Sequence, residues 1–149
     1  MIEVQTDLKL PTAEQLSAAF REARDKFLTE GGEQLRQAVE RSIRTSGMTI
    51  RSGKIVAWQR LYRSKGYAAV RPISGETGAN SPGAITNYLE GGHKIRGISG
   101  QAARYYPRIH VAHVAGFRFY ESARQDAQKI AADVAERISE AVAQKINNI

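Results

Sequence analysis

The sequence predicts an α+β protein in which a long N-terminal helix and a long C-terminal helix cover a small antiparallel sheet. Apolar residues recur at helical spacing in residues 12–46 and again in residues 120–147. Between these two blocks, residues 48–119 contain short β-branched and aromatic runs that are separated by glycine-rich turns. Helices and strands that occupy separate blocks of a chain favour an α+β arrangement.

The length and composition are those of a single globular domain. The chain has 149 residues, of which 42% are apolar and 25% are charged, so it can bury one core. It contains no cysteine, which excludes a disulfide framework and thiolate chemistry. No apolar run reaches the roughly 18 residues of a transmembrane helix, and the N-terminus lacks a signal-peptide pattern. We therefore expect no membrane partner.

The N-terminal helix has clear start and stop signals. Residues 1–11 should form an arm or a short strand, and Thr12 with Gln15 then forms a capping-box pattern. At Gly31 and Gly32 we expect a bend, or two helices nearly in line, and Gly47 is placed to end the helix. The predicted buried stripe consists of Leu16, Phe20, Ala23, Phe27, Leu35, Val39 and Ile43.

The middle of the chain predicts a hairpin followed by loops. Residues 55–63 and 67–73 read as strands, joined by a three-residue loop with Gly66 in the left-handed position. Pro72 cannot donate to a ladder, so the second strand should end there or lie at an edge. Residues 84–90 form a further short element and residues 109–114 another strand. The glycine-rich segments 74–83 and 91–108 are predicted to be mobile loops.

The last helix is predicted to start near Tyr120. Its apolar residues recur at helical spacing and should form one buried stripe. They are Ala123, Ala127, Ile130, Val134, Ile138, Ala141 and Val142.

The net charge of +7 is concentrated in the middle of the chain. Residues 51–108 carry ten basic side chains against only two acidic ones, Glu76 and Glu90. Such a region can attract polyanions, although a solvated basic surface explains it equally well. Aromatic residues interleave with the basic ones, which is typical of single-strand binders but also of core or cross-strand packing. These aromatic residues are Trp58, Tyr62, Tyr67, Tyr105 and Tyr106.

Enzyme chemistry has little support in the sequence. There is no phosphate-binding glycine loop, no nucleophile elbow and no pair of carboxylates in the middle of the chain. Glu90, His93, His110 and His113 could form a metal cluster, but His110 and His113 would point to opposite faces of a strand. For Glu90 and His93 a local contact or a backbone hydrogen bond is the commoner arrangement. We therefore expect no catalytic residue, no metal and no cofactor.

Four short motifs occur in a fixed order between about residues 45 and 140. They are Ser52-Gly53-Lys54-Ile55, Gly66-Tyr67-Ala68-Ala69-Val70, Tyr88-Leu89-Glu90-Gly91-Gly92-His93, and the step from Gly116 through Phe119 to Ala123. In this order the motifs resemble the neck and tail-completion family of tailed bacteriophages. The chain departs from that family by lacking a proline before the last helix and by a long insertion at residues 94–108. The resemblance implies structural roles for Tyr88, Glu90, Gly91, Gly92, His93, Gly116 and Phe119.

The resemblance further implies a non-enzymatic virion protein that forms a ring, commonly a hexamer, at the head–tail joint or the tail end. Its partners would be copies of itself and the neighbouring connector, tail-tube or terminator proteins, with non-specific DNA contact in the lumen. It would assemble in the host cytoplasm and reside in the tail or neck. Basic and aromatic residues would meet a neighbouring subunit or DNA: Lys94, Arg96, Arg104, Tyr105, Tyr106 and Arg108. We favour the subunit, because interfaces are enriched in aromatic and arginine anchors.

Two alternatives remain open at this point. The chain could be a basic nucleic-acid-binding module, in which case phosphate contacts would make its binding strongly salt-dependent. The weaker alternative is a small metal-dependent hydrolase that uses His93, His110 and His113, and tightly bound zinc would support it.

Overall fold

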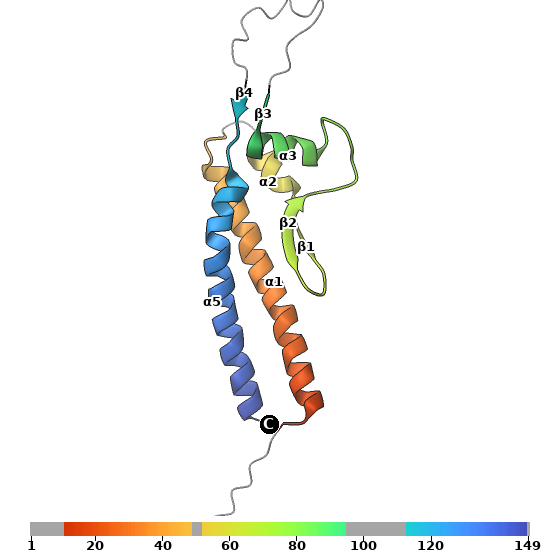
Figure 1. Ribbon diagram of the computed structural model, residues 1–149, viewed down its shortest axis with the longest axis vertical. Coiled ribbons are helices and arrows are strands. Elements are labelled where there is room, and N and C mark those ends of the chain that lie inside the picture. The colour runs from red at the N-terminus through yellow and green to blue at the C-terminus, as the bar shows by residue number, and fades with distance from the viewer. Residues whose placement is uncertain (1–10, 49–51, 95–112, 149) are drawn as a thin grey trace, which may run out of the picture.

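Two long antiparallel helices form the body of the protein, and the computed structural model describes residues 11–48, 52–94 and 113–148. Helices α1 (Ala13–Thr45) and α5 (Phe119–Asn147) lie side by side along the length of the molecule (Figure 1). The elements between them are α2 (Ser52–Trp58), β1 (Gln59–Arg63), β2 (Ala68–Pro72), α3 (Pro82–Gly91), β3 (Gly92–Lys94) and β4 (His113–Ala115). The predicted α+β class is confirmed, while the expected N-terminal arm, residues 1–10, lies outside the described residues.

Helix α1 begins at the predicted capping box. The Thr12 hydroxyl accepts from the Gln15 backbone N–H at 3.2 Å, and the Gln15 side chain accepts from the Thr12 N–H at 2.8 Å. The helix then runs through Gly31 and Gly32 as one continuous element (Figure 1). A Cβ on Gly32 would lie 2.8 Å from Leu61 Cδ1, so this glycine allows the β1–β2 hairpin to approach α1 closely. Gly32 thus marks a packing site, and the glycine pair is not a boundary between two helices.

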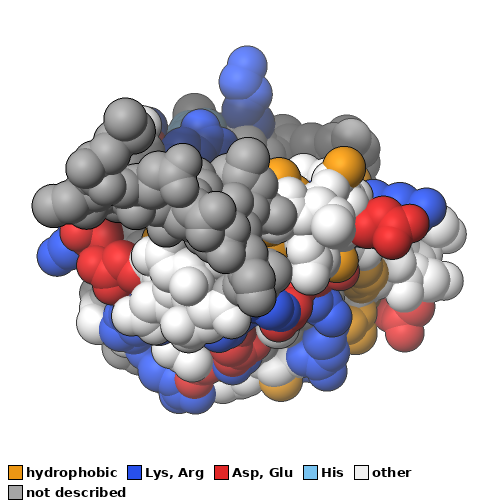
Figure 2. Space-filling model, turned by 90° about the horizontal axis from the view of Figure 1, so that it is seen from below, with side chains coloured by type: hydrophobic (Ala, Val, Ile, Leu, Met, Phe, Trp, Pro, Cys, Tyr) orange, Lys and Arg blue, Asp and Glu red, His pale blue; other side chains and the backbone are white. Residues whose placement is uncertain are grey.

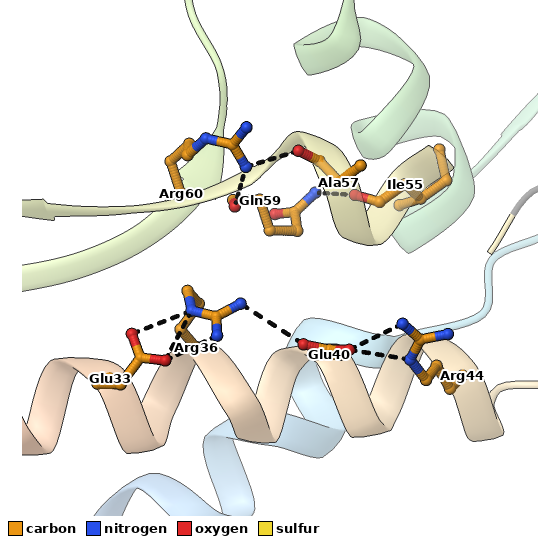
Figure 3. A network of polar contacts seen from close by, with 8 residues as sticks. All are labelled: Glu33, Arg36, Glu40, Arg44, Ile55, Ala57, Gln59 and Arg60. Atoms are coloured by element: carbon orange, nitrogen blue, oxygen red, sulfur yellow. Dashed lines mark hydrogen bonds and ion pairs between the residues drawn. The ribbon is translucent and has the colours of Figure 1, made fainter. Parts of the chain in front are cut away.

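The prediction of a strand over residues 55–58 is wrong. These residues belong to α2, which buries Ile55 in the core and half-buries Val56 and Trp58 against it. A run of four apolar residues fits a buried helix as well as a strand, and here the tertiary contacts decide for the helix. The switch into β1 occurs at the buried Gln59, whose Nε2 donates to the Ile55 carbonyl at 3.1 Å (Figure 3).

The hairpin itself is confirmed. Strands β1 and β2 pair antiparallel, and β2 ends at Pro72, opposite Gln59. The connection is one residue longer than predicted, because the strands end at Arg63 and restart at Ala68. Gly66 is not in the left-handed region, so that detail of the predicted loop is also wrong.

The predicted short element at residues 84–90 is a helix that starts earlier. Ser81 caps α3 by accepting from the Ala84 N–H at 3.2 Å, and Pro82 occupies the first turn, where its missing N–H costs nothing. The loop predicted over residues 74–83 therefore ends at Ser81. Its predicted mobility stays a prediction. Of the loop predicted over residues 91–108, Gly91 ends α3, residues 92–94 form β3, and the remainder lies outside the described residues.

The core lies where α1, α2 and the start of α5 meet. The predicted stripes are confirmed at Val39, Ile43, Ala123, Val134 and Ile138, which are all buried. The core cluster consists of Ala38, Val39, Ile43, Met48, Ile55, Phe119 and Ala123. The prediction for Phe20 is wrong, because its side chain is 62% exposed. At that level of α1, among the described residues, no strand covers the helix and only α5 packs beside it.

Charged side chains form ion pairs on the outer surface of α1 and α5. Arg137 pairs with Glu30, in the middle of α1, at 3.3 Å, and Lys145 pairs with Glu22 nearer to the end of the body where α5 ends. Acidic and basic side chains are intermixed on the face seen from this end (Figure 2). Along α1, Glu33, Arg36, Glu40 and Arg44 form a chain of ion pairs (Figure 3). The hydrogen bond from Arg36 holds the pKa of Glu33 below its usual value. Pairs this exposed contribute little to stability.

Among the described residues, no helix combines the length and hydrophobicity needed to cross a bilayer.

Candidate functional site: the joint at the base of an arm

Strands β3 and β4 form a two-stranded arm that projects from the upper end of the body (Figure 1). They pair antiparallel, with Gly92 opposite Ala115, His93 opposite Val114, and Lys94 opposite His113. We refer to these two strands as the arm. The place where α3 passes into β3 and β4 passes into α5 is called the joint, and it contains Glu90, Gly92, Gly116 and the first turn of α5.

Glu90 caps a helix that begins 29 residues later in the chain. Its Oε2 accepts from the Tyr120 N–H at 2.9 Å, and its Oε1 accepts from the Glu121 N–H at 3.1 Å. The first turn of a helix has N–H groups without intrahelical partners and carries a partial positive charge. A carboxylate that accepts from two of these groups fixes the start of α5 to the end of α3.

The backbone completes this connection. The residue before α5, Arg118, has φ +52° and provides no side-chain cap, so Glu90 takes the place of a local capping residue. Phe117 and Arg118 donate their N–H groups to the carbonyls of Leu89 and Glu90, at 2.7 and 3.1 Å. These hydrogen bonds give partners to the last carbonyls of α3 and to the backbone N–H groups just before α5, which would otherwise have none.

Gly92 and Gly116 are required by this close crossing of backbones. A Cβ on Gly116 would lie less than 3.0 Å from the Glu90 carbonyl and the Gly92 nitrogen. A Cβ on Gly92 would lie less than 3.0 Å from the Val114 oxygen and the Gly116 nitrogen, and Gly92 also has φ +75°. Neither position accommodates a side chain, since the opposing atoms belong to the backbone and cannot move aside.

A second polar tie connects the start of α5 to the hairpin. The Tyr120 hydroxyl donates to Gln59 Oε1, and Gln59 in turn donates to the Ile55 carbonyl. Burial, reinforced by the nearby Glu90 carboxylate, raises the pKa of the Tyr120 hydroxyl well above its ordinary value, so this group stays a neutral donor. The joint is therefore held to the core as well as to α3.

The other residues of the resemblance have different surroundings. Phe119 is buried in the core cluster, directly below the joint. Tyr88 is exposed and its ring lies 5.5 Å from the His93 ring. Gly91, the last residue of α3, has open space around it and takes no part in the crossing.

The metal hypothesis is not supported by the residues that the structure places. Both carboxylate oxygens of Glu90 accept hydrogen bonds from the α5 backbone. His93 pairs with Val114 and His113 with Lys94, so these two imidazoles lie on opposite faces of the arm. Residues 11–48, 52–94 and 113–148 contain no group of three potential ligands, while His110 lies outside them.

Two of the aromatic residues in the basic middle contact basic residues of their own chain. Lys54 Nζ lies 5.2 Å from the centre of the Trp58 ring, and the Arg71 guanidinium lies 4.1 Å from that of Tyr62. These rings are already covered by cations, which leaves less of their faces for stacking on bases. Of the proposed interface residues, only Lys94 is described, as an exposed side chain of the arm. Arg96, Arg104, Tyr105, Tyr106 and Arg108 lie outside the described residues.

An exposed apolar patch lies beside the joint. Tyr88, Val114 and Phe117 are all exposed, and Val114 is the cross-strand neighbour of His93, whose ring lies beside that of Tyr88 in a tilted arrangement. Large apolar side chains gathered at one place on a surface are typical of an interaction site.

No protein-family model matches the chain, and neither a curated protein nor a solved structure is significantly similar to it. The resemblance to phage neck proteins therefore rests on the order and spacing of the four motifs.

Sequence reasoning missed Gln59, Arg118 and Tyr120. Gln59 lies in a run that looks like a strand, and nothing local indicates that its amide is buried. Arg118 is an unusual residue for a left-handed backbone position, so its place before the helix has no sequence signal. Glu90 was singled out as part of a motif, but the helix that it caps could only be identified in three dimensions.

Proposed function

We propose that this chain is a structural protein of a tailed phage or prophage that assembles with copies of itself into a ring at the neck or tail end. The observation that carries the proposal is the joint. Glu90, Gly92 and Gly116, three of the motif residues, meet at one point and hold an arm in a fixed direction. An arm anchored in this way suits a protein that presents a contact surface and performs no chemistry.

The surface around the arm supports assembly as well. The apolar patch of Tyr88, Val114 and Phe117 lies at its base, and the segment that joins β3 to β4 carries arginines and tyrosines without an acidic residue. Protein interfaces commonly combine an apolar centre with aromatic and arginine anchors. A neighbouring subunit with acidic residues would complement this arrangement.

The nucleic-acid-binding alternative has weaker support. Its pattern depends on aromatic residues that are available for base stacking. Trp58 and Tyr62 instead contact Lys54 and Arg71, and two basic side chains of β1 make local hydrogen bonds. Arg63 donates to Thr29 Oγ1, and Arg60 donates to the Ala57 carbonyl at 2.6 Å.

Charge reversal in the segment that joins β3 to β4 tests the proposal, and we call the resulting double variant the arm variant. We expect the double variant Arg104→Glu, Arg108→Glu to have the melting temperature of the parent. Its particle mass, measured by light scattering, should be lower than that of the parent assembly. A second double variant, Arg41→Glu with Lys129→Glu, makes the same charge change at exposed positions away from the arm and from β2, and should assemble normally.

The competing results are distinct. Normal assembly of the folded arm variant would contradict the docking role of the arm. If the arm variant assembles normally but loses salt-dependent retention on DNA, the nucleic-acid-binding reading is correct.

A further inference from the structure

Within residues 11–48, 52–94 and 113–148, one edge of strand β2 has no partner strand, and that edge lines a groove. Among the described residues, β1 is its only neighbour in the sheet. Two backbone hydrogen bonds of 2.9 Å lie at the two ends of the hairpin ladder. Ser64 N–H donates to the Tyr67 carbonyl, and Ile73 N–H donates to the Trp58 carbonyl. Hydrogen-bonded and non-bonded pairs alternate in an antiparallel ladder, so the N–H and C=O groups of Ala68 and Val70 point away from β1.

The groove lies between β2 and α5, with α1 as its floor. Two adjoining hollows of about 470 and 190 Å³ share Leu35, Ala68 and Ala127 as lining residues. Along α1 they extend from Phe27 to Val39, which corresponds to about 18 Å of helix. A strand rises about 3.3 Å per residue, so the groove has room for five or six residues of extended chain beside β2.

The groove is apolar at its floor and basic at its outer wall. Ala68 and Val70 alternate with Ala69 and Arg71 along β2, and Val70 packs on the core beneath. Arg71 and Arg124 line the larger hollow, and neither hollow contains a carboxylate among its lining residues. A strand that fits here would have one apolar face, for the floor, and acidic residues on its other face.

One segment of the chain has this pattern. Residues 2–10 read Ile-Glu-Val-Gln-Thr-Asp-Leu-Lys-Leu, which alternates apolar residues or threonine with polar ones throughout. Glu3 and Asp7 fall on the polar side, the side that would lie next to Arg71. The other candidate segment, residues 95–112, contains arginines and no acidic residue, so its charge would oppose that of the groove.

The reach of residues 2–10 decides which copy supplies them. Gly32, which Ala68 contacts, lies 19 residues beyond Ala13, or about 28 Å along α1. Nine extended residues span about 30 Å, so residues 2–10 of the same chain would reach only as far as the first residue of β2. A second copy has no such limit, because its α1 can begin beside the groove. Exposed Phe20 and Tyr67 lie at the lower approach to the groove, where a second copy would cover them.

We infer that residues 2–10 of a second copy of this chain add to the free edge of β2 as an extra antiparallel or parallel strand. The inference rests on the proposed ring and names one contact that would hold it together. The backbone groups of Ala68 and Val70 would provide the affinity, and the alternation of apolar and acidic residues would fix which face turns inward.

Single thiols test this contact, since the chain has no cysteine of its own. Full-length Gln5→Cys chains are mixed with tagged full-length Ala69→Cys chains and treated with a short bis-maleimide. Both positions lie on the polar side of their strands, so cross-linked pairs of one tagged and one untagged chain are expected. The matched control acceptor is Ala135→Cys, an exposed alanine on α5, which should cross-link several times less.

Each outcome has one meaning. Equal yields for the two acceptors, with both variants folded, would overturn the inference. A Gln5→Cys, Ala69→Cys chain that cross-links only within itself at all concentrations would show that the chain's own segment fills the groove, which also overturns it. Rings that form without the cross-link leave the proposed function intact, whereas cross-linked pairs that never form rings support the contact and contradict the ring.

Discussion

Glu90 is the residue on which the orientation of the arm depends. Its carboxylate accepts two backbone N–H groups of α5, while its carbonyl accepts a third from Arg118. A helix cap is normally supplied by the residue next to the helix, and Arg118 provides none. Glu90 therefore fixes the end of α3 to the start of α5, and loss of its side chain should loosen both of these helix ends.

We expect Glu90→Gln to lower the free energy of unfolding by about 1 kcal/mol, because the amide keeps one acceptor but loses the charge. Glu90→Ala should cost about 1–3 kcal/mol, since the Tyr120 N–H, in a partly buried bond, and the exposed Glu121 N–H both lose their partner. Glu121→Gln is the control, because that exposed carboxylate pairs only with Arg118 among the described residues. Urea denaturation measures all three. Equal stabilities for the Glu90 and Glu121 variants would contradict the capping role.

Gly116, in the joint, and Gly91, next to it, provide a second comparison. Gly116→Ala should destabilise the protein by about 3 kcal/mol or more, because the added Cβ meets backbone atoms that cannot move aside. Gly91→Ala adds the same atom at the end of α3, where nothing lies within 4 Å, and should change stability by less than about 1 kcal/mol. Thermal unfolding of the two variants distinguishes them. A Gly116 variant as stable as the parent would mean that the backbones do not cross this closely.

At the scale of elements, the sequence predicted best where the signal was local. The capping box at Thr12 and the glycine that ends α1 are set by neighbouring residues, and both were predicted closely. The start of α5 was predicted to within one residue from its apolar stripe, although its cap is the distant Glu90. Residues 55–58 failed because a short apolar run does not specify its own secondary structure. The expectation of two helices meeting at Gly31 and Gly32 failed, because Gly32 is needed for the approach of Leu61, which is distant in sequence.

The two helical stripes differ in how deeply they are buried, and truncation should show it. Ile43→Ala should cost about 2–5 kcal/mol, because Ile43 is fully buried in the core. Phe20→Ala should change the stability of the isolated chain by no more than about 0.5 kcal/mol, because its ring is largely exposed. The measurement is chemical denaturation at low protein concentration, where copies remain apart. A large loss for Phe20→Ala under these conditions would place its ring in the core of the single chain.

At the scale of the whole molecule, the candidate site could be predicted only in part. The motif residues Glu90, Gly92 and Gly116 were identified from sequence, but their meeting point depends on the return of the chain after the arm. Pro72 indicated that β2 ends there or lies at an edge, but the groove beside it had no sequence signal, because it exists only between α1, β2 and α5. Among the described residues, the body thus combines one fixed arm and one strand edge without a partner, and these are the two contacts that we propose between copies.

Negative-stain electron microscopy of the purified full-length chain, together with its mass from light scattering, tests the central claim most directly. We predict closed particles with a central opening and a mass that is a whole multiple of the 16.4 kDa chain. Rotational averages of these particles should show one repeated unit per copy. A monomer at every concentration examined, or open filaments without closure, would contradict the account.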